Sequence, residues 1–170
     1  MTAITDRVET PGVADERTML TSFLDYFRAT LAQKCDGLSA EQLAQRNVEP
    51  SPLSLLGLVR HMAEVERNWA RRLDGEETTG RYYGKDDPDG DFTNVAADPA
   101  QVTDAFAYWQ DEIAHAREVY NAHSLDDTFV GHSGRVISLR WILVHLIEEY
   151  ARHNGHADIV RERIDGLRGE

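Results

Sequence analysis

The chain has 170 residues, of which 41% are hydrophobic and 28% charged, enough to form one domain with a stable core. Its net charge of −12 disfavours nucleic acid and anionic membranes as partners, because an acidic surface repels phosphate groups. No apolar run reaches the roughly 20 residues that a membrane helix needs. The polar N-terminus and the lone cysteine, Cys35, favour a cytoplasmic protein without disulfides.

Four segments with apolar residues at spacings of three and four predict four amphipathic helices. Ser39 predicts a short turn of helix after the first of them, and Asp98-Pro99 and Ser138 are typical caps for the third and fourth. The expected bounds of the four helices are 15–35, 54–74, 98–123 and 138–164.

The connecting segments are polar or rich in glycine. Residues 75–97 predict a long loop, which we interpret as a partial lid over a pocket. Tyr82 and Tyr83 in this loop either border a pocket or pack on the surface. Residues 125–137 predict either an ordered loop or a short hairpin. We expect residues 1–14 to be disordered and residues 15–168 to form a single domain. The predicted fold class is all-α, an up-and-down four-helix bundle.

The apolar face of the fourth helix contains two residues that are costly to bury, Glu149 and His153. They are four positions apart, so their side chains can meet at one point. Such a pair is often a simple salt bridge on a surface. Within an apolar face, however, a bound dication would account for both side chains, since it needs an ionised carboxylate and a neutral imidazole.

His61, at the edge of the apolar face of the second helix, is the best candidate for a third ligand. Two histidines and one carboxylate form a catalytic zinc set that leaves a coordination position open. The same ligands also suit iron(II), and nickel is a further alternative. No catalytic residue is predicted beyond this metal site.

Four further residues lie near the predicted ligands by helical spacing. We expect His145 and His156 on the fourth helix, and Glu64 and Asn68 on the second, to orient a ligand or contact a substrate. His145 could instead replace His153 as a ligand, His156 could be a half-exposed surface histidine, and Glu64 could be solvated. Cys35 is interpreted as a packing residue and not as a nucleophile.

Two segments resemble the DinB-like superfamily: LSLLGLVRHMAEVERNW (53–69) and SLRWILVHLIEEYARHNGHADIVRERIDG (138–166). The resemblance implies a four-helix bundle with a metal held by one histidine on the second helix and two residues, four apart, on the last. His61, Glu149 and His153 match these positions. The glutamate at position 149 resembles the ligand set of the mycothiol-dependent maleylpyruvate isomerase type, which also has glutamate there. After the last ligand, this chain has Asn154-Gly155-His156 where others often read Arg-Gly-Gln.

The resemblance further implies an enzyme, a zinc-dependent S-transferase that uses a small thiol such as mycothiol to attack an electrophile. Its partners would be these small molecules, with a homodimer as a further expectation. The alternative is a metal-binding stress or interaction protein without turnover. A third interpretation is iron-dependent oxidative chemistry.

Overall fold

A computed structural model describes residues 6–131 and 134–169. Four long helices begin where a polar side chain accepts a hydrogen bond from the first helical turn, and these caps are Asp15, Ser54, Asp98 and Ser138. The helices are α1 (Glu16–Cys35), α3 (Leu55–Leu73), α5 (Pro99–Ala122) and α6 (Leu139–Asp165). Each bound lies within one residue of the bound expected from the sequence.

Four short elements join the long helices. Ser39 and Gln42 form a capping box at the start of α2 (Ala40–Ala44). Strands β1 (Thr128–Val130) and β2 (Val136–Ser138) pair antiparallel, with Phe129 opposite Ile137, so the hairpin is the correct reading of residues 125–137. The long connection contains a helix that the sequence did not predict, α4 (Gly90–Thr93), which begins without a side-chain cap.

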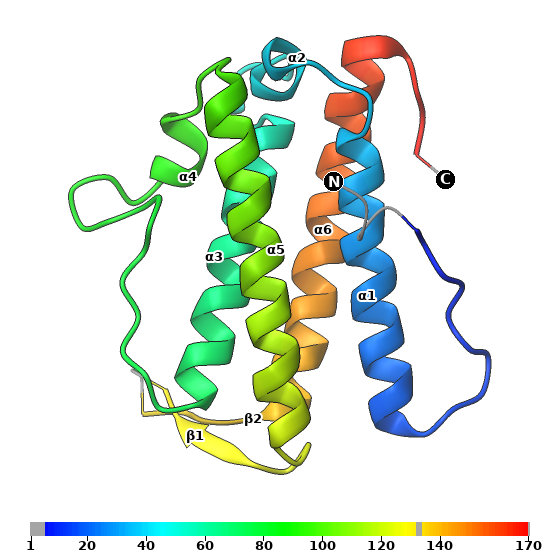
Figure 1. Ribbon diagram of the computed structural model, residues 1–170, viewed down its shortest axis with the longest axis vertical. Coiled ribbons are helices and arrows are strands. Elements are labelled where there is room, and N and C mark those ends of the chain that lie inside the picture. Colours follow the sequence, from blue (N-terminus) through cyan, green and yellow to red (C-terminus); the bar gives the residue numbers. More distant parts are fainter. Residues whose placement is uncertain (1–5, 132–133, 170) are drawn as a thin grey trace.

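The long helices form the expected all-α bundle, but their directions do not alternate strictly. In Figure 1, α1 and α6 run the same way and α3 and α5 run the opposite way. The ends of α3 and α5 meet where His123 Nε2 lies 3.5 Å from Asp74 Oδ1. The helices therefore differ from the predicted strict up-and-down order. Residues 74–98 are long enough to carry the chain back along the whole bundle, so α5 begins at the same end as α3. α1 packs mainly on α6, and α3 mainly on α5.

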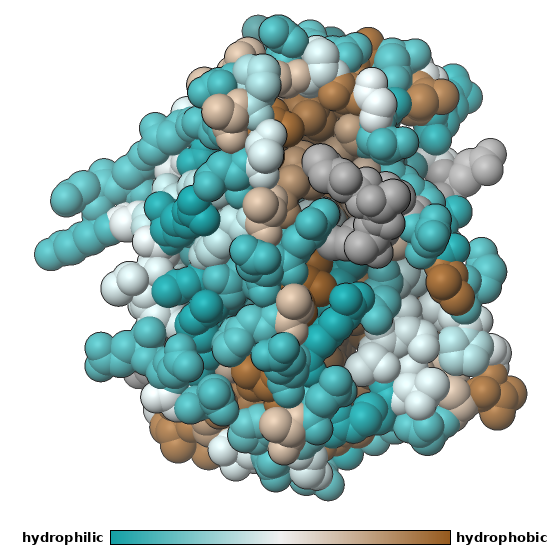
Figure 2. Space-filling model, in the orientation of Figure 1, coloured by the Kyte–Doolittle hydropathy of each residue, from teal (hydrophilic) through white to brown (hydrophobic). Residues whose placement is uncertain are grey.

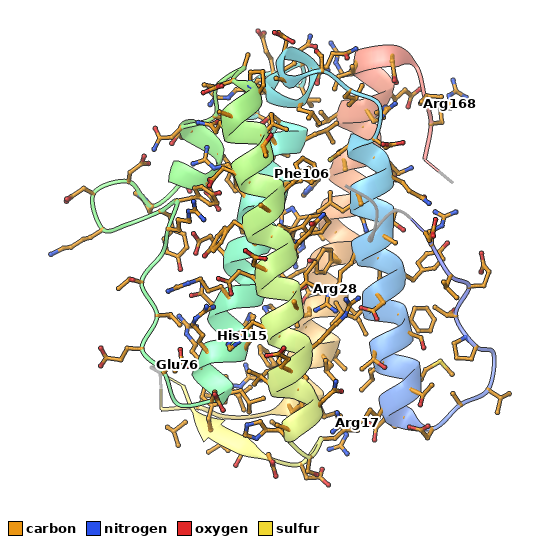
Figure 3. The ribbon with its side chains drawn as sticks, in the orientation of Figure 1. Arg17, Arg28, Glu76, Phe106, His115 and Arg168 are labelled. Atoms are coloured by element: carbon orange, nitrogen blue, oxygen red, sulfur yellow. The ribbon has the colours of Figure 1, made fainter. Side chains whose placement is uncertain are left out.

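A buried polar network joins the four long helices at mid-height. Arg28 on α1 donates to both carboxylate oxygens of Glu66 on α3 at 2.7 Å, and Figure 3 shows Arg28 lying between α1 and its neighbours. Tyr150 on α6 donates to Glu66 at 2.8 Å and accepts a hydrogen bond from Trp109 on α5 at 2.8 Å. Glu66 and Tyr150 are completely buried, so this network fixes how the helices are rotated against one another.

The visible face of the molecule is largely hydrophilic (Figure 2). No helix within residues 6–131 and 134–169 has the length and apolar character that crossing a bilayer requires. Residues 1–5 lie outside the described part, and residues 6–15 form neither helix nor strand. Disorder of residues 1–14 and a single domain over residues 15–168 stay predictions.

Candidate metal centre

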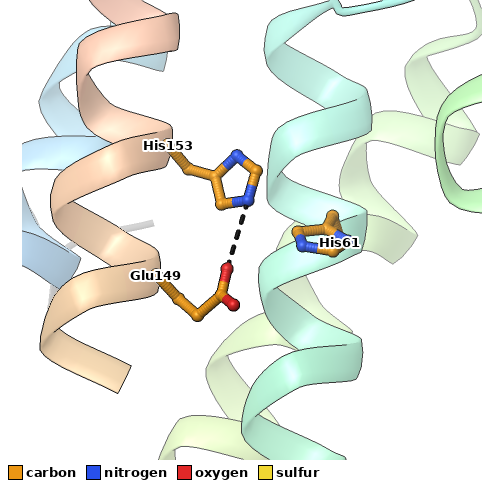
Figure 4. A group of neighbouring side chains, drawn as sticks. All are labelled: His61, Glu149 and His153. Atoms are coloured by element: carbon orange, nitrogen blue, oxygen red, sulfur yellow. Dashed lines mark ion pairs between the residues drawn. The ribbon is translucent and has the colours of Figure 1, made fainter. Parts of the chain in front are cut away.

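The three predicted ligands come together between α3 and α6 (Figure 4). One donor atom each from His61, Glu149 and His153 lies within 4.8 Å of the other two. His153 Nε2 is 3.4 Å from Glu149 Oε2, and the rings of His61 and His153 have centroids 4.7 Å apart. Among the described residues, this is the cluster of histidine and acidic side chains that has the geometry to hold a metal ion.

The helices account for this convergence. Glu149 and His153 lie one turn apart on α6, and α3 passes beside them in the opposite direction (Figure 4). The side chains of His61, Glu149 and His153 are 25%, 15% and 11% exposed. The cluster is therefore partly open, so a small ligand can approach the donor atoms.

The electrostatic environment keeps His153 neutral. Burial, followed by the positive charges available on His61, His156 and Arg152, lowers the pKa of His153 to about 3. A neutral imidazole keeps a nitrogen lone pair, which is the form that coordinates a metal. The donor set of two imidazoles and one carboxylate therefore fits a divalent ion such as zinc or iron(II).

Asp91 is a residue of this site that the sequence did not reveal. Its Oδ2 lies 2.8 Å from Nδ1 of His61, and the residue is only 4% exposed. A proton on Nδ1 would leave Nε2 of His61 free for a metal, as in carboxylate–histidine–metal arrangements. The sequence carried no signal because Asp91 follows other acidic residues in a polar connection.

Arg60 places α4, and with it Asp91, beside the cluster. Its guanidinium donates to the carbonyl oxygens of Gly90 at 2.9 Å and Asn94 at 2.7 Å. The ring of Phe92 lies 5.1 Å from that of His61. The long connection thus covers one side of the site, and its role as a partial lid over a pocket stays a prediction.

The two further histidines of α6 contact the predicted ligands. His145 Nε2 lies 3.5 Å from Glu149 Oε1, and the His145 ring stacks on Trp141 with a centroid separation of 4.8 Å. His156 Nδ1 lies 3.4 Å from Nδ1 of His153. His153 therefore faces Glu149 with one ring nitrogen and His156 with the other. His145 and His156 are thus placed where they can orient Glu149 and His153, and that role stays a prediction.

Glu64 and Asn68 hold the long connection, and their hydrogen bonds do not involve the three predicted ligands. Glu64 Oε1 accepts from the backbone N–H groups of Arg81 at 2.6 Å and Tyr82 at 2.8 Å. Asn68 Nδ2 donates to the Tyr83 hydroxyl at 2.8 Å. Glu64 is 2% exposed, so the alternative that it is solvated is wrong. On a helix, side chains 61 and 64 point about 60° apart. Glu64 can therefore contact the connection while His61 faces α6.

Cys35 is not part of the candidate metal centre. Its side chain is buried, and burial raises the pKa of its thiol to about 12. This agrees with its interpretation as a packing residue.

A helical bundle with a histidine–glutamate–histidine cluster between two of its helices defines a DinB-like class of protein. Comparison with protein families supports a more particular assignment, because the mycothiol S-transferase model matches residues 19–166. The chain therefore belongs to the mycothiol S-transferase family, and the predicted relationship to the DinB-like superfamily is confirmed. Neither the curated proteins nor the solved structures gave a match.

Proposed function

We propose that this protein is a metal-dependent S-transferase that activates mycothiol for attack on an electrophile, with zinc as the metal. The observation that carries the proposal is the convergence of His61, Glu149 and His153. Family membership supports mycothiol as the thiol substrate. We infer that the protein acts in the cytoplasm.

The bound metal would supply Lewis acidity that ionises the thiol at neutral pH, where a free thiol of pKa about 8.5 is only a few per cent ionised. The side chains of the protein prepare the site for it. His153 stays neutral, and Asp91 orients His61. Because a more acidic thiol is also less nucleophilic, most of the acceleration should come from holding thiol and electrophile together.

The proposal is tested by elemental analysis and turnover. We expect about one equivalent of metal per chain and catalysed transfer of mycothiol to a generic electrophile. Glu149→Ala should lower kcat/KM by more than about 100-fold, since losing even an outer partner of a metal ligand costs about 10- to 100-fold. The matched control is Glu162→Ala, which removes an exposed carboxylate from the same helix and should retain turnover.

A Glu149→Ala enzyme as fast as the parent would contradict the proposal. Cobalt(II) substitution gives an independent reading: a visible spectrum that changes when mycothiol is added supports a thiol at the metal. An unchanged spectrum would favour the alternative of a metal-binding protein without turnover. Oxygen consumption by the iron(II) form would instead favour oxidative chemistry.

A further inference from the structure

An aromatic surface continues the metal centre along the seam between α3 and α6. Trp69 lies two turns, about 12 Å, along α3 from His61, and His145 lies one turn along α6 from Glu149. The rings of Trp141 and His145 stack at 4.8 Å with planes 16° apart, and Trp69 contacts both, at 5.2 and 5.1 Å. We call Trp69, Trp141 and His145 the aromatic wall.

The aromatic wall is partly exposed and touches the metal centre directly. All three side chains are half-buried, whereas the other tryptophan, Trp109, is fully buried in the core. His145 Nε2 lies 3.5 Å from Glu149 Oε1. A planar molecule stacked on the wall would therefore lie beside the predicted metal ligands.

Two arginines flank this wall without a carboxylate partner. The guanidinium carbon of Arg135 lies 4.8 Å from the ring centre of Trp141, and that of Arg72 lies 5.7 Å from the ring centre of Trp69. No ion pair of either arginine occurs within the described ranges, although the chain carries a net charge of −12. Most other arginines of the described chain donate to a carboxylate or a carbonyl oxygen. The exceptions are therefore concentrated on the wall.

Arg72 also has a buried donor that lacks an acceptor. Its Nε is inaccessible to solvent and makes no hydrogen bond within the described residues. A charged group with an unpaired buried donor is costly, and an anionic ligand at the accessible part of the half-buried guanidinium would lower that cost. Arg72 and Phe129 line a cavity of about 350 Å³ between the end of α3 and β1. Glu76 and Glu77 also line this cavity; Glu76 lies 3.6 Å from Arg71, and Glu77 is exposed to solvent.

We propose that the wall and its arginines bind the electrophile, and that this electrophile is a planar, conjugated or aromatic molecule carrying a carboxylate. This inference rests on the proposed S-transferase function and names its second substrate. Its planar part stacks on one ring of the aromatic wall and meets the others edge-on, because the plane of Trp69 is 63° and 78° from those of Trp141 and His145. Its carboxylate accepts hydrogen bonds from Arg72 and Arg135. The reactive end of the molecule then faces Glu149 and His153.

The transfer balances without a further reagent. The thiol sulfur forms a bond to the electrophilic carbon, the leaving group departs with the electron pair of its former bond, and the thiol proton passes to solvent. A suitable probe is 4-chloro-3,5-dinitrobenzoate, from which chloride leaves. Its uncharged counterpart is 4-chloro-3,5-dinitrobenzotrifluoride.

Binding is measured first, in the absence of turnover. Calorimetry should show that the full chain binds 2-naphthoate at least about tenfold more tightly than 2-naphthamide, as expected for charge-assisted hydrogen bonds. Arg72→Gln and Arg135→Gln should each remove most of this preference. Lys85→Gln, which removes an exposed positive charge on the long connection, is the matched control and should keep it. Circular dichroism checks that each variant is folded.

Turnover with the two chloro compounds completes the test. The ratio of kcat/KM for the benzoate to that for the benzotrifluoride should fall about tenfold in Arg72→Gln, mainly through KM, and stay constant in Lys85→Gln. Equal affinity of the parent chain for naphthoate and naphthamide would overturn the inference, as would equal losses in Arg72→Gln and Lys85→Gln. Absence of all turnover, with naphthoate still bound selectively, would instead contradict the proposed function alone.

Discussion

At the scale of single residues, a metal site depends on side chains that never touch the metal. Asp91 is the example here, because its carboxylate lies 2.8 Å from the His61 nitrogen that would face away from the ion. We expect it to decide which ring nitrogen carries the proton and to hold the ring in one orientation. The proposed metal site therefore comprises three ligands and a fourth residue, Asp91, that positions one of them.

Removing the charge of Asp91 tests this role. We expect Asp91→Asn to weaken metal affinity about 10- to 100-fold, because the amide can no longer fix the His61 tautomer reliably. Competition with a chromophoric chelator measures the change. Asp89→Asn is the control, as Asp89 is exposed and makes no capping hydrogen bond at the start of the same short helix. Similar affinities in the two variants would show that Asp91 does not orient the ligand.

Cys35 gives a second prediction at this scale. With a pKa raised to about 12 by burial, its thiol should react with iodoacetamide at pH 8 only when the chain unfolds. The native state holds this proton more tightly than the unfolded chain, whose thiol has a pKa of about 8.5. Its contribution to stability is therefore complete below about pH 8.5 and is lost as pH rises toward 12. Rapid labelling of the native protein at pH 8 would contradict this.

At the scale of elements, the connection between α3 and α5 forms part of the site. It carries Asp91, and its middle is tied to α3 because Glu64 accepts two backbone hydrogen bonds there. The sequence predicted a polar loop, since α4 has four residues and no cap. Its fixed position depends on buried contacts with α3 that no local pattern reveals.

Replacing Glu64 by alanine should loosen this connection. Two backbone N–H groups would lose their acceptor, so the amides of Arg81 and Tyr82 should exchange with deuterium at least about tenfold faster, equivalent to about 1.4 kcal/mol. Hydrogen-exchange mass spectrometry of the 75–97 peptide measures the effect. Glu77→Ala, which removes an exposed carboxylate from the same connection, should leave exchange unchanged. Unaltered exchange in Glu64→Ala would mean that other contacts hold the connection.

At the scale of the whole molecule, the buried pair of Arg28 and Glu66 ties α1 to α3, and Tyr150 extends it to α6. Burial alone would lower the pKa of Arg28, but its attraction to Glu66 raises that pKa, so the guanidinium remains charged. Burial and the charge of Glu66 raise the pKa of Tyr150, which keeps its hydroxyl proton as a donor. Tyr150 follows Glu149 directly, so the network also helps to fix the rotation of the helix that carries two of the predicted ligands.

Breaking this network should be costly. Glu66→Ala leaves the buried guanidinium of Arg28 with the half-exposed Asp25 as its remaining carboxylate partner and should lower the free energy of unfolding by about 3–5 kcal/mol, as measured by urea denaturation. The double variant Arg28→Met/Glu66→Leu should recover much of that loss. Glu162→Ala breaks the exposed pair with Arg168, which lies near one end of the bundle (Figure 3), and should cost less than about 1 kcal/mol. Equal losses from both single variants would contradict the prediction.

The four long helices and the pairing of Glu149 with His153 could be predicted from local patterns, because caps and helical spacing are local properties of the chain. The sequence also indicated His61, whose apolar neighbours placed it at the edge of a buried face. The tertiary structure decided the rest. Contacts between residues distant in sequence set the parallel direction of α3 and α5. They also set the hydrogen-bond partners of Glu64 and Asn68 and the contact of Asp91 with His61. Such contacts form only when buried polar groups of different elements find one another, and no periodicity records them.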